Sequence, residues 1–385
     1  MVSSKPEIVF AFPDCMGGVA SLNYNLINYS TLKSNFYVKV ILLKQKEDNR
    51  PAFLEKFDAD EVVHFHFSSK ENRYYVLKRL SRHLGKEDGA IVCDNLMTMQ
   101  SALLFGCTKT IFHYLHDFFY VKQQIEAGTM SDAVVTHSRF FADCAYAADP
   151  ENFKGRTFYV PYGVKQLDAL PRKKGGGLNL VFLGRLDRSK GILSLHNINC
   201  ELEKNGVQVN WSIVGKGHLK KELVEQWKNN ENVCFYSPDT TDEVYDILKS
   251  QDVFVFPTSY EGTPVSVLEC LSCAVVTIVS DLPGGIRDII NEAIGFRCPL
   301  DDVAYMAEKI IALDRNRELL SSMQRSCFEL GRKNFDIKEN ADNNFRLFMR
   351  FKELKRKEKV ISVRLSRLDK PYLPNALVKF LRSIG

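Results

Sequence analysis

Two glutamates, Glu261 and Glu269, stand eight residues apart around the start of a predicted helix. Glu261 lies in the loop that follows the predicted strand Asp252–Phe256. Thr263 is expected to cap the helix and Pro264 to begin it. A loop between a parallel strand and a helix N-terminus binds anionic groups, because its N–H groups are unpaired and the helix dipole is favourable. The carboxylate of Glu269 has apolar neighbours in sequence, so it needs hydrogen-bond donors such as sugar or ribose hydroxyls. Two solvated glutamates of an ordinary βαβ unit are the alternative.

Two cations, Arg185 and Lys190, follow a second predicted strand, Asn179–Leu183. Glycines at positions 184 and 191 flank them and allow the backbone to turn at the strand end. A planar guanidinium and a compact ammonium at this spacing can converge on one diphosphate. The pattern predicts a phosphate site, with two solvated basic residues as the alternative.

A histidine and a glycine pair follow two further predicted strands. His116 comes just after Thr110–Tyr114, where it would point into the ligand crevice of a parallel sheet. A buried structural histidine is the alternative. Gly17 and Gly18 follow Glu7–Phe12 in a tight strand-to-helix turn. The absence of a G-x-G-x-x-G fingerprint here disfavours a dinucleotide site.

In their order along the chain, these blocks resemble the motifs of retaining glycosyltransferases of the GT-B fold, above all glycosyltransferase family 4 (glycosyl transferases group 1). The resemblance extends to about residue 335. It implies that Glu269 holds the nucleotide ribose, that Glu261 contacts donor-sugar hydroxyls, and that amides after Glu261 meet the phosphate. It also implies that the two cations bind the donor phosphates and that the histidine lies against the donor sugar. The implied catalytic residues are His116, Arg185, Lys190 and Glu261, and the implied donor-binding residues are Gly17, Gly18, Gly215, Ser237, Thr263, Pro264, Val265 and Glu269.

Four positions depart from the family pattern, and one of them is Val276, which stands where the family often carries proline. Tyr162 replaces the usual asparagine in Val160–Val164, at the entry to the predicted linker. Ala274 stands where the family often carries glycine, near the predicted end of the helix. Thr263 replaces the usual phenylalanine beside the donor sugar, which leaves the identity of that sugar open.

Predicted strands recur along most of the chain, separated mostly by helical stretches, as in a parallel, doubly wound sheet. With the resemblance, this pattern implies an α/β protein of GT-B fold, with two Rossmann-like domains facing across a cleft. We expect an acceptor-binding domain at 1–164, a linker at 165–178, a nucleotide-sugar-binding domain at 179–336, and a crossing helix with a basic tail at 337–385. The other predicted strands are Val38–Leu43, Val62–Phe67, Ala90–Cys93, Ala133–Thr136, Ser212–Val214, Val233–Tyr236 and Val275–Val279.

Length and composition favour a protein of two domains without a membrane span. At 385 residues the chain is about twice a typical domain. No apolar run approaches the roughly 20 residues of a membrane span, and the N-terminus lacks the pattern of a signal peptide, so a cytoplasmic location is expected. The cysteines are scattered, which is typical of buried thiols, and Cys270-x-x-Cys273 lies inside the predicted helix. The resemblance implies a metal-independent reaction without cofactor.

The C-terminal segment is strongly basic. From Arg350 to Gly385 eleven Lys and Arg stand against three acidic residues, a net charge of +8 in a chain whose total is +5. Ile337 to about Lys359 is predicted to be the crossing helix. The remainder mixes basic and apolar residues, as would an element on an anionic membrane surface at the inner face. A solvated helix end with a frayed tail is the alternative, and nucleic acid is disfavoured because no recognised binding module accompanies the charge.

We therefore predict a glycosyltransferase of the EC 2.4 class that moves a sugar from a nucleoside diphosphate sugar to an acceptor hydroxyl with retention of configuration. Its setting would be bacterial-type polysaccharide or glycolipid assembly, with a saccharide, a lipid-linked or a small-molecule acceptor. Charge developing on the leaving diphosphate would be met by the two cations and by helix N-terminal amides. A catalytically inactive nucleotide-sugar-binding regulatory subunit is the alternative. An NAD-dependent oxidoreductase would need a glycine fingerprint with a ribose-binding acid.

Overall fold

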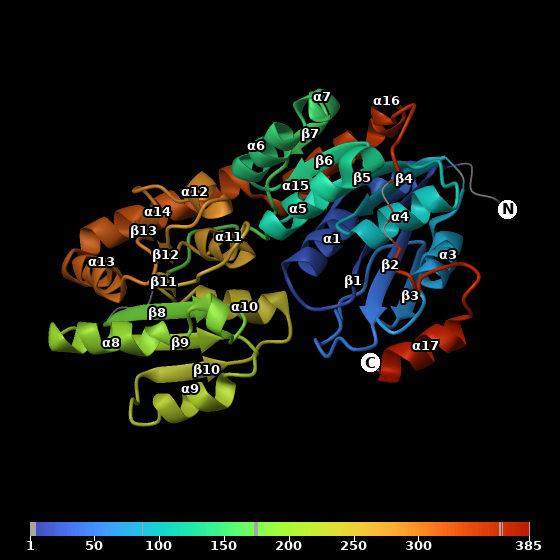
Figure 1. Ribbon diagram of the computed structural model, residues 1–385. Helices are drawn as coiled ribbons and strands as arrows, with labels where there is room; N and C mark the ends of the chain where they lie inside the picture. The colour runs from blue at the N-terminus through green and yellow to red at the C-terminus, as the bar shows by residue number, and fades with distance from the viewer. Residues whose placement is uncertain (1–4, 87, 173–175, 362, 364, 385) are drawn as a thin grey trace. The chain divides into compact units, whose positions relative to one another are not determined.

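The computed structural model describes residues 5–384, except 87, 173–175, 362 and 364. The chain divides into two compact units, which we call unit 1 (Met1–Gly163 with Lys338–Gly385) and unit 2 (Val164–Ile337). Each unit is built on one parallel sheet with helices packed against it (Figure 1). The predicted α/β class with two doubly wound sheets is confirmed.

The sheet of unit 1 runs in the order β3-β2-β1-β4-β5-β6-β7. All its neighbouring strands pair in parallel. The sequence predicted every strand except β7, whose three residues are all only partly buried and show no alternation. The strands are β1 Glu7–Pro13, β2 Tyr37–Gln45, β3 Glu61–Phe67, β4 Gly89–Cys93, β5 Thr110–Leu115, β6 Ala133–Thr136 and β7 Thr157–Tyr159.

Several helices of unit 1 begin at a side-chain cap just after a strand or loop. Asn72, Asn95 and Asp117 each accept a hydrogen bond from a backbone N–H of the helix that they precede. The helices before the C-terminal segment are α1 Gly18–Tyr29, α2 Leu32–Asn35, α3 Arg73–Leu84, α4 Leu96–Leu104, α5 Phe118–Ala127, α6 Arg139–Ala148 and α7 Pro150–Phe153, with a 3₁₀ turn at Gly128–Met130.

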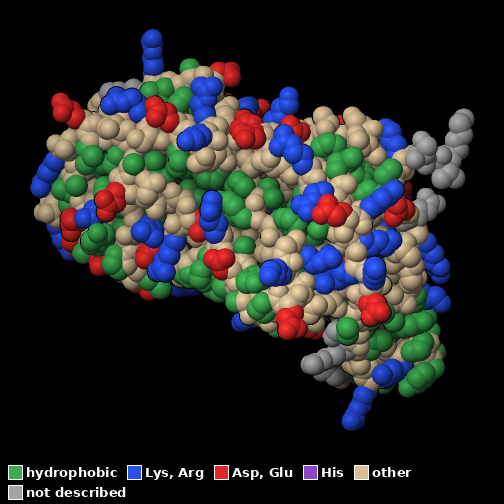
Figure 2. Space-filling view, turned by 90° about the horizontal axis from the view of Figure 1, so that it is seen from above, with side chains coloured by type: hydrophobic (Ala, Val, Ile, Leu, Met, Phe, Trp, Pro, Cys, Tyr) green, Lys and Arg blue, Asp and Glu red, His purple; other side chains and the backbone are tan. Residues whose placement is uncertain are grey.

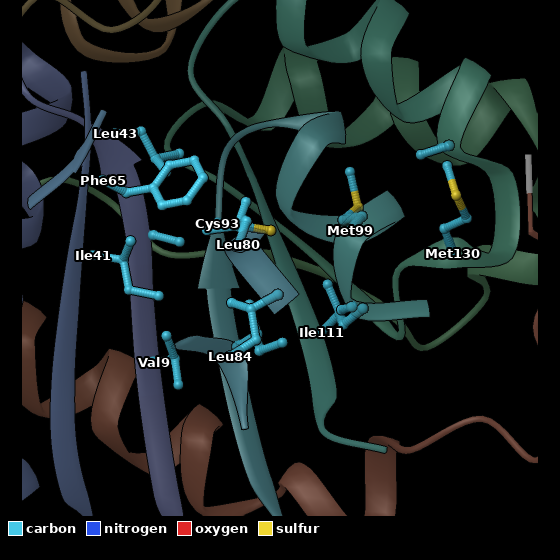
Figure 3. Packing of buried hydrophobic residues seen from close by; sticks show 14 of the residues in the cluster. Val9, Ile41, Leu43, Phe65, Leu80, Leu84, Cys93, Met99, Ile111 and Met130 are labelled. Atoms are coloured by element: carbon cyan, nitrogen blue, oxygen red, sulfur yellow. The ribbon is translucent and has the colours of Figure 1, made fainter. Parts of the chain in front are cut away.

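One apolar cluster holds α3 and α4 against the sheet of unit 1 (Figure 3). The strands contribute β-branched and other apolar residues from one face, and the helices contribute leucines and a methionine. Because the cluster spans β1 to β5, it fixes the strand ends from which the loops of this unit leave. The labelled members are Val9, Ile41, Leu43, Phe65, Leu80, Leu84, Cys93, Met99, Ile111 and Met130.

The sheet of unit 2 has the order β10-β9-β8-β11-β12-β13. In both units the strand order reverses beside the first strand, which makes β1/β4 and β8/β11 the topological switch points where open α/β sheets bind ligands. The strands are β8 Leu178–Leu183, β9 Val209–Val214, β10 Val233–Tyr236, β11 Val253–Phe256, β12 Val276–Ser280 and β13 Gly295–Cys298. The helices are α8 Ser194–Lys204, α9 Lys220–Gln226, α10 Thr241–Leu248, α11 Val265–Ser272, α12 Gly285–Ile289, α13 Val303–Arg315 and α14 Arg317–Asn334, with a 3₁₀ turn at Arg188–Lys190.

Helix α11 begins one residue later than predicted, at Val265. Pro264 has ψ 115° and occupies the N-cap position that was predicted for Thr263. Thr263 is buried against Gly285, where a Cβ would lie 2.5 Å from its Oγ1. The helix ends at Ser272, two residues before Ala274, whose φ of 55° lies in the left-handed region that favours glycine.

The sequence predicted one long helix from Ile337 to about Lys359, but the structure shows shorter helices. The C-terminal segment forms α15 Ile337–Met349 and α16 Phe351–Leu354, and ends in α17 Asn375–Ile384. The chain leaves the helix after α16 because Asp132, which is fully buried, binds the backbone N–H of Arg356 at 2.7 Å and the ammonium group of Lys359.

Candidate functional site

Two loops of unit 2 are tied together at the β8/β11 switch point. Gly191, after the 3₁₀ turn, has φ 67°, and a Cβ there would lie 1.8 Å from the carbonyl oxygen of Pro257. The carbonyl oxygen of Ser189 accepts hydrogen bonds from the N–H of Ser259 at 2.9 Å and from the hydroxyl of Thr258 at 3.1 Å. The loop after β8 is therefore fixed against the loop after β11, and only glycine fits at the point of contact.

This arrangement brings Lys190 and Glu261 into contact. The Nζ atom of Lys190 lies 2.5 Å from Oε1 of Glu261 and donates a second hydrogen bond to the carbonyl oxygen of Tyr260 at 3.3 Å. Each of the two charged side chains is only 13% exposed. Two predicted site residues that are 71 positions apart in sequence thus share one charge-assisted hydrogen bond.

Arg185 lies on the same loop but is held more loosely. Its side chain is 63% exposed, and its Nη1 atom lies 3.3 Å from Oδ2 of Asp187, a surface pair of small net energy. Burial favours a higher pKa for Asp187, but the hydrogen bond from Ser189 and the charges of Arg185 and Lys190 outweigh it and lower the pKa. The guanidinium can turn toward a phosphate at little cost.

The loops after β9 and β10 pack against the loop after β8. A Cβ at Gly215 would lie 1.9 Å from the carbonyl oxygen of Gly184. The hydroxyl of Ser237 donates to the carbonyl oxygen of Gly215 at 3.3 Å and accepts from Nζ of Lys220 at 2.7 Å. The predicted donor residues Gly215 and Ser237 are therefore in direct contact.

Helix α11 begins with the predicted donor residues. Pro264 is buried, and Val265 is the first helical residue. The N–H of Val267 donates to the carbonyl oxygen of Pro264 at 3.2 Å, whereas the N–H groups of Val265 and Ser266 come before the first intrahelical bond. One turn further, Glu269 is partly exposed, and its carboxylate has no hydrogen-bond or ion-pair partner among the described residues. Burial raises the pKa of Glu269 to about 7. In these surroundings the carboxylate would be stabilised by hydrogen-bond donors such as ligand hydroxyls.

In unit 1, His116 lies just beyond β5 and is buried. Its Nδ1 atom is 2.8 Å from the hydroxyl oxygen of Tyr162, and its Nε2 atom has no hydrogen-bond partner among the described residues. Burial, with His137 and His113 nearby, lowers the pKa of His116 well below its ordinary value, so the imidazole is neutral. The ring of Tyr162 in turn stacks on His137 at 3.8 Å.

Sequence reasoning named Tyr162 only as a departure from the family pattern and did not assign it a role. A phenol donates hydrogen bonds well, and the neutral imidazole has one acceptor nitrogen. The hydroxyl oxygen of Tyr162 and Nδ1 of His116 share one hydrogen bond, and the tautomer of His116 sets which of them donates. No signal in the sequence pairs residues 116 and 162, because the contact depends on the path of the chain after β7.

Gly17 lies in the loop after β1 and Gly18 is the first residue of α1, and both are exposed. Gly17 has φ 153° and occupies the N-cap position of α1. At the same switch point sequence reasoning missed Asp94, which directly follows β4. Asp94 is buried, its Oδ2 atom has no partner among the described residues, and burial raises its pKa to about 6. The signal was available, because Cys93-Asp94-Asn95 ends a strand in the same way as the motif at His116.

The described residues hold no group of three or more His, Cys, Asp and Glu that could bind a metal ion. None of the described helices is long and apolar enough to cross a membrane. On the face drawn in Figure 2, blue Lys and Arg side chains are interspersed with red Asp and Glu side chains.

The sequence of unit 2 matches a known family. Residues 167–328 match the model of Glycosyl transferases group 1. Over 132 residues the chain is 28% identical to a UDP-Gal:alpha-D-GlcNAc-diphosphoundecaprenol alpha-1,3-galactosyltransferase of Escherichia coli, a match that spans 34% of each protein. It is 24% identical over 328 residues to an uncharacterized glycosyltransferase of Haemophilus influenzae, covering 80% of this chain and 89% of the relative.

Solved structures share the whole fold at low sequence identity. The sucrose-phosphate synthase of Thermosynechococcus elongatus superposes with a TM-score of 0.70 at 15% identity, over 90% of this chain and 99% of that one. Anabaena Alr3699/HepE in complex with UDP gives a TM-score of 0.67 at 13% identity, over 89% and 99%. The fold is therefore that of the GT-B glycosyltransferases, and the segment that matches the group 1 model lies within unit 2.

The pKa of Glu269 predicts how stability depends on pH. The folded state keeps this proton up to about pH 7, whereas the unfolded chain loses it near the ordinary value of 4.5. The unfolded state therefore binds fewer protons between these values, and stability falls as the pH rises through them. Glu269→Gln should match the native protein near pH 4 and exceed it by up to about 3 kcal/mol at pH 8. Urea unfolding across this range measures the difference, with the exposed Glu225→Gln as control. Parallel curves for native and Glu269→Gln protein would contradict the assignment.

The hydrogen bond between Tyr162 and His116 predicts a selective effect on turnover. Tyr162→Phe should lower kcat by about three- to tenfold, the worth of one neutral hydrogen bond, and leave nucleoside diphosphate affinity unchanged. Steady-state kinetics and calorimetry separate the two quantities, and ¹⁵N NMR of the histidine rings should show the loss of a single tautomer at His116. The control is Tyr120→Phe, because Tyr120 packs edge-on against His116 at 4.8 Å with no hydrogen bond to it. An equal loss in both variants would mark the effect as packing alone.

Proposed function

We propose that the chain transfers a sugar from a nucleoside diphosphate sugar to an acceptor hydroxyl with retention of anomeric configuration. The observation that carries this proposal is the contact between Lys190 and Glu261 at the switch point of unit 2. The ammonium group would bind the diphosphate and the carboxylate would bind sugar hydroxyls, and the two groups are hydrogen-bonded to each other. Glu269, partly exposed and without a side-chain partner among the described residues, supports a ribose contact one turn into α11.

The proposed chemistry uses charge that is already in place. As the bond between the sugar and the diphosphate breaks, negative charge grows on the leaving phosphate, and Lys190, Arg185 and the first amides of α11 are assigned to meet it. The acceptor hydroxyl attacks on the face from which the phosphate departs, and that phosphate takes the proton. His116 is assigned to the donor sugar through Nε2. The proposal assigns no role to a metal ion.

The relatives and neighbours guide the choice of substrates. Structures of Anabaena Alr3699/HepE hold UDP, and relatives from Escherichia coli and Campylobacter jejuni are named for diphosphoundecaprenol-linked acceptors. We infer a UDP-sugar donor and a lipid-linked saccharide acceptor. An acceptor of this kind requires the enzyme to work at the inner face of a membrane, as a peripheral protein.

An assay with a panel of UDP-, GDP- and ADP-sugars tests the proposed function. We expect hydrolysis or transfer with a UDP-sugar, unchanged by EDTA, and NMR of the first-formed product should show the anomeric configuration of the donor. An inverted product would overturn retention, and loss of activity in EDTA would overturn the metal-free mechanism. Failure of every nucleotide to bind by calorimetry would overturn the donor site itself.

The two cations predict a non-additive loss of rate. Arg185→Ala and Lys190→Ala should each lower kcat by roughly 10- to 1,000-fold, because each gains strength as charge moves onto the leaving phosphate. The double variant should lose less than the product of the two, because both act on one group. Arg185→Lys should recover only part of the rate. The control is Lys221→Ala, which changes an exposed lysine on α9. If steady-state kinetics show a native kcat for either single variant, that residue has no role in the reaction.

A further inference from the structure

The last helix, α17, turns its apolar stripe toward solvent. The exposed fractions of Leu377, Phe380, Leu381 and Ile384 are 44, 60, 37 and 69%. Their spacing of i, i+3, i+4 and i+7 puts them on one helix face, the face that a globular protein normally buries. Tyr372, 75% exposed, precedes the helix. Gathered apolar surface of this kind marks an interaction site.

The opposite face of α17 is clamped to unit 1. Arg382 donates to both carboxylate oxygens of Asp369 at 2.9 Å. Asn375 Oδ1 accepts from the N–H of Asn72, the cap of α3, at 2.8 Å. Val378 is fully buried. These contacts fix the stripe so that it faces outward. Turning the helix would break the ion pair between Arg382 and Asp369.

A polar groove of about 410 Å³ adjoins this helix. Its cations include Lys46 and Lys379, neither of which has an ion-pair partner among the described residues. Glu71, the only acidic residue in the lining, is buried and neutralised by Arg79 at 2.9 Å. The groove is thus suited to a phosphate group at the edge of the apolar stripe.

We propose that α17 is a membrane-docking element that inserts Leu377, Phe380, Leu381 and Ile384 between the headgroups of an anionic bilayer, while Lys46 and Lys379 contact lipid phosphates. The net charge of the tail overstates the cations available for this contact. The guanidinium of Arg356 donates to the carbonyl oxygens of Ser131 and Asn152. Lys359 is bound to Asp132, and Arg382 is bound to Asp369. The apolar stripe must therefore supply most of the affinity.

A second copy of the chain is a poorer occupant of this face. A helix of ten residues is only about 15 Å long, and its stripe falls short of the roughly 800 Å² per partner of a stable interface. Lys46 and Lys379 beside the stripe would also repel the same residues of a second copy and attract an anionic surface.

Vesicle flotation tests the proposal with the full chain. The probes are vesicles of phosphatidylcholine alone and vesicles that also contain phosphatidylglycerol. The native protein should float with the anionic vesicles, and Phe380→Ser with Ile384→Ser should lower the partition coefficient at least about tenfold, since each side chain loses its burial. Lys379→Glu should also weaken vesicle binding, and the loss should be larger in low salt than in high salt. The control is Leu54→Ser, which removes an apolar side chain that is 77% exposed elsewhere in unit 1.

Three results would overturn the proposal. The native protein could fail to float with anionic vesicles, or the double serine variant could float as well as the native protein. Alternatively, sedimentation without lipid could show a dimer that the double variant abolishes, which would make a second copy the occupant. Vesicle binding is measured without any sugar transfer, so its failure leaves the proposed reaction standing, and failure of the reaction leaves the docking element standing.

Discussion

The contact between Lys190 and Glu261 depends on the close approach of two backbone turns. The strands β8 and β11 are neighbours in the sheet, and their loops meet where Gly191 faces the carbonyl oxygen of Pro257. A side chain at position 191 would push the loops apart and separate the two charges. Because the pair is largely removed from water, its attraction is stronger than that of a surface pair. The protein thus holds the ammonium group in place before any ligand arrives, which lowers the cost of reorganisation during a reaction.

The two glutamates of the motif have opposite surroundings, and this difference supports their separate assignments. Glu261 has a cation beside it. Glu269 has no such neighbour, and burial alone raises its pKa to about 7. A carboxylate that is costly to ionise gains most from a ligand with hydroxyl donors, whereas a carboxylate already bound to a cation can exchange part of that contact for a sugar hydroxyl. The glutamate in the loop and the glutamate in the helix can therefore take different roles in the same site.

Several basic residues of the C-terminal tail are paired inside unit 1, so the net charge of the tail overstates the cations that it exposes. Asp132 and Asp369, both buried, form ion pairs with Lys359 and Arg382 of the basic tail, and Asp132 also accepts from the backbone N–H of Arg356. These carboxylates fix the path of the chain between α16 and α17. The tail therefore acts as a structural strap on unit 1, and what it leaves exposed at its end is chiefly apolar.

The sequence by itself determined the two parallel sheets, because runs of apolar residues ending at glycine, proline and charged residues define strands and their ends. It also placed most of the candidate residues at strand ends, where the parallel topology collects them. Only the tertiary structure decided which of them meet. The contacts of Lys190 with Glu261 and of His116 with Tyr162, and the outward face of α17, depend on chain paths between distant segments. Local propensity carries no record of these contacts, because their energy arises only when segments far apart in sequence are packed together.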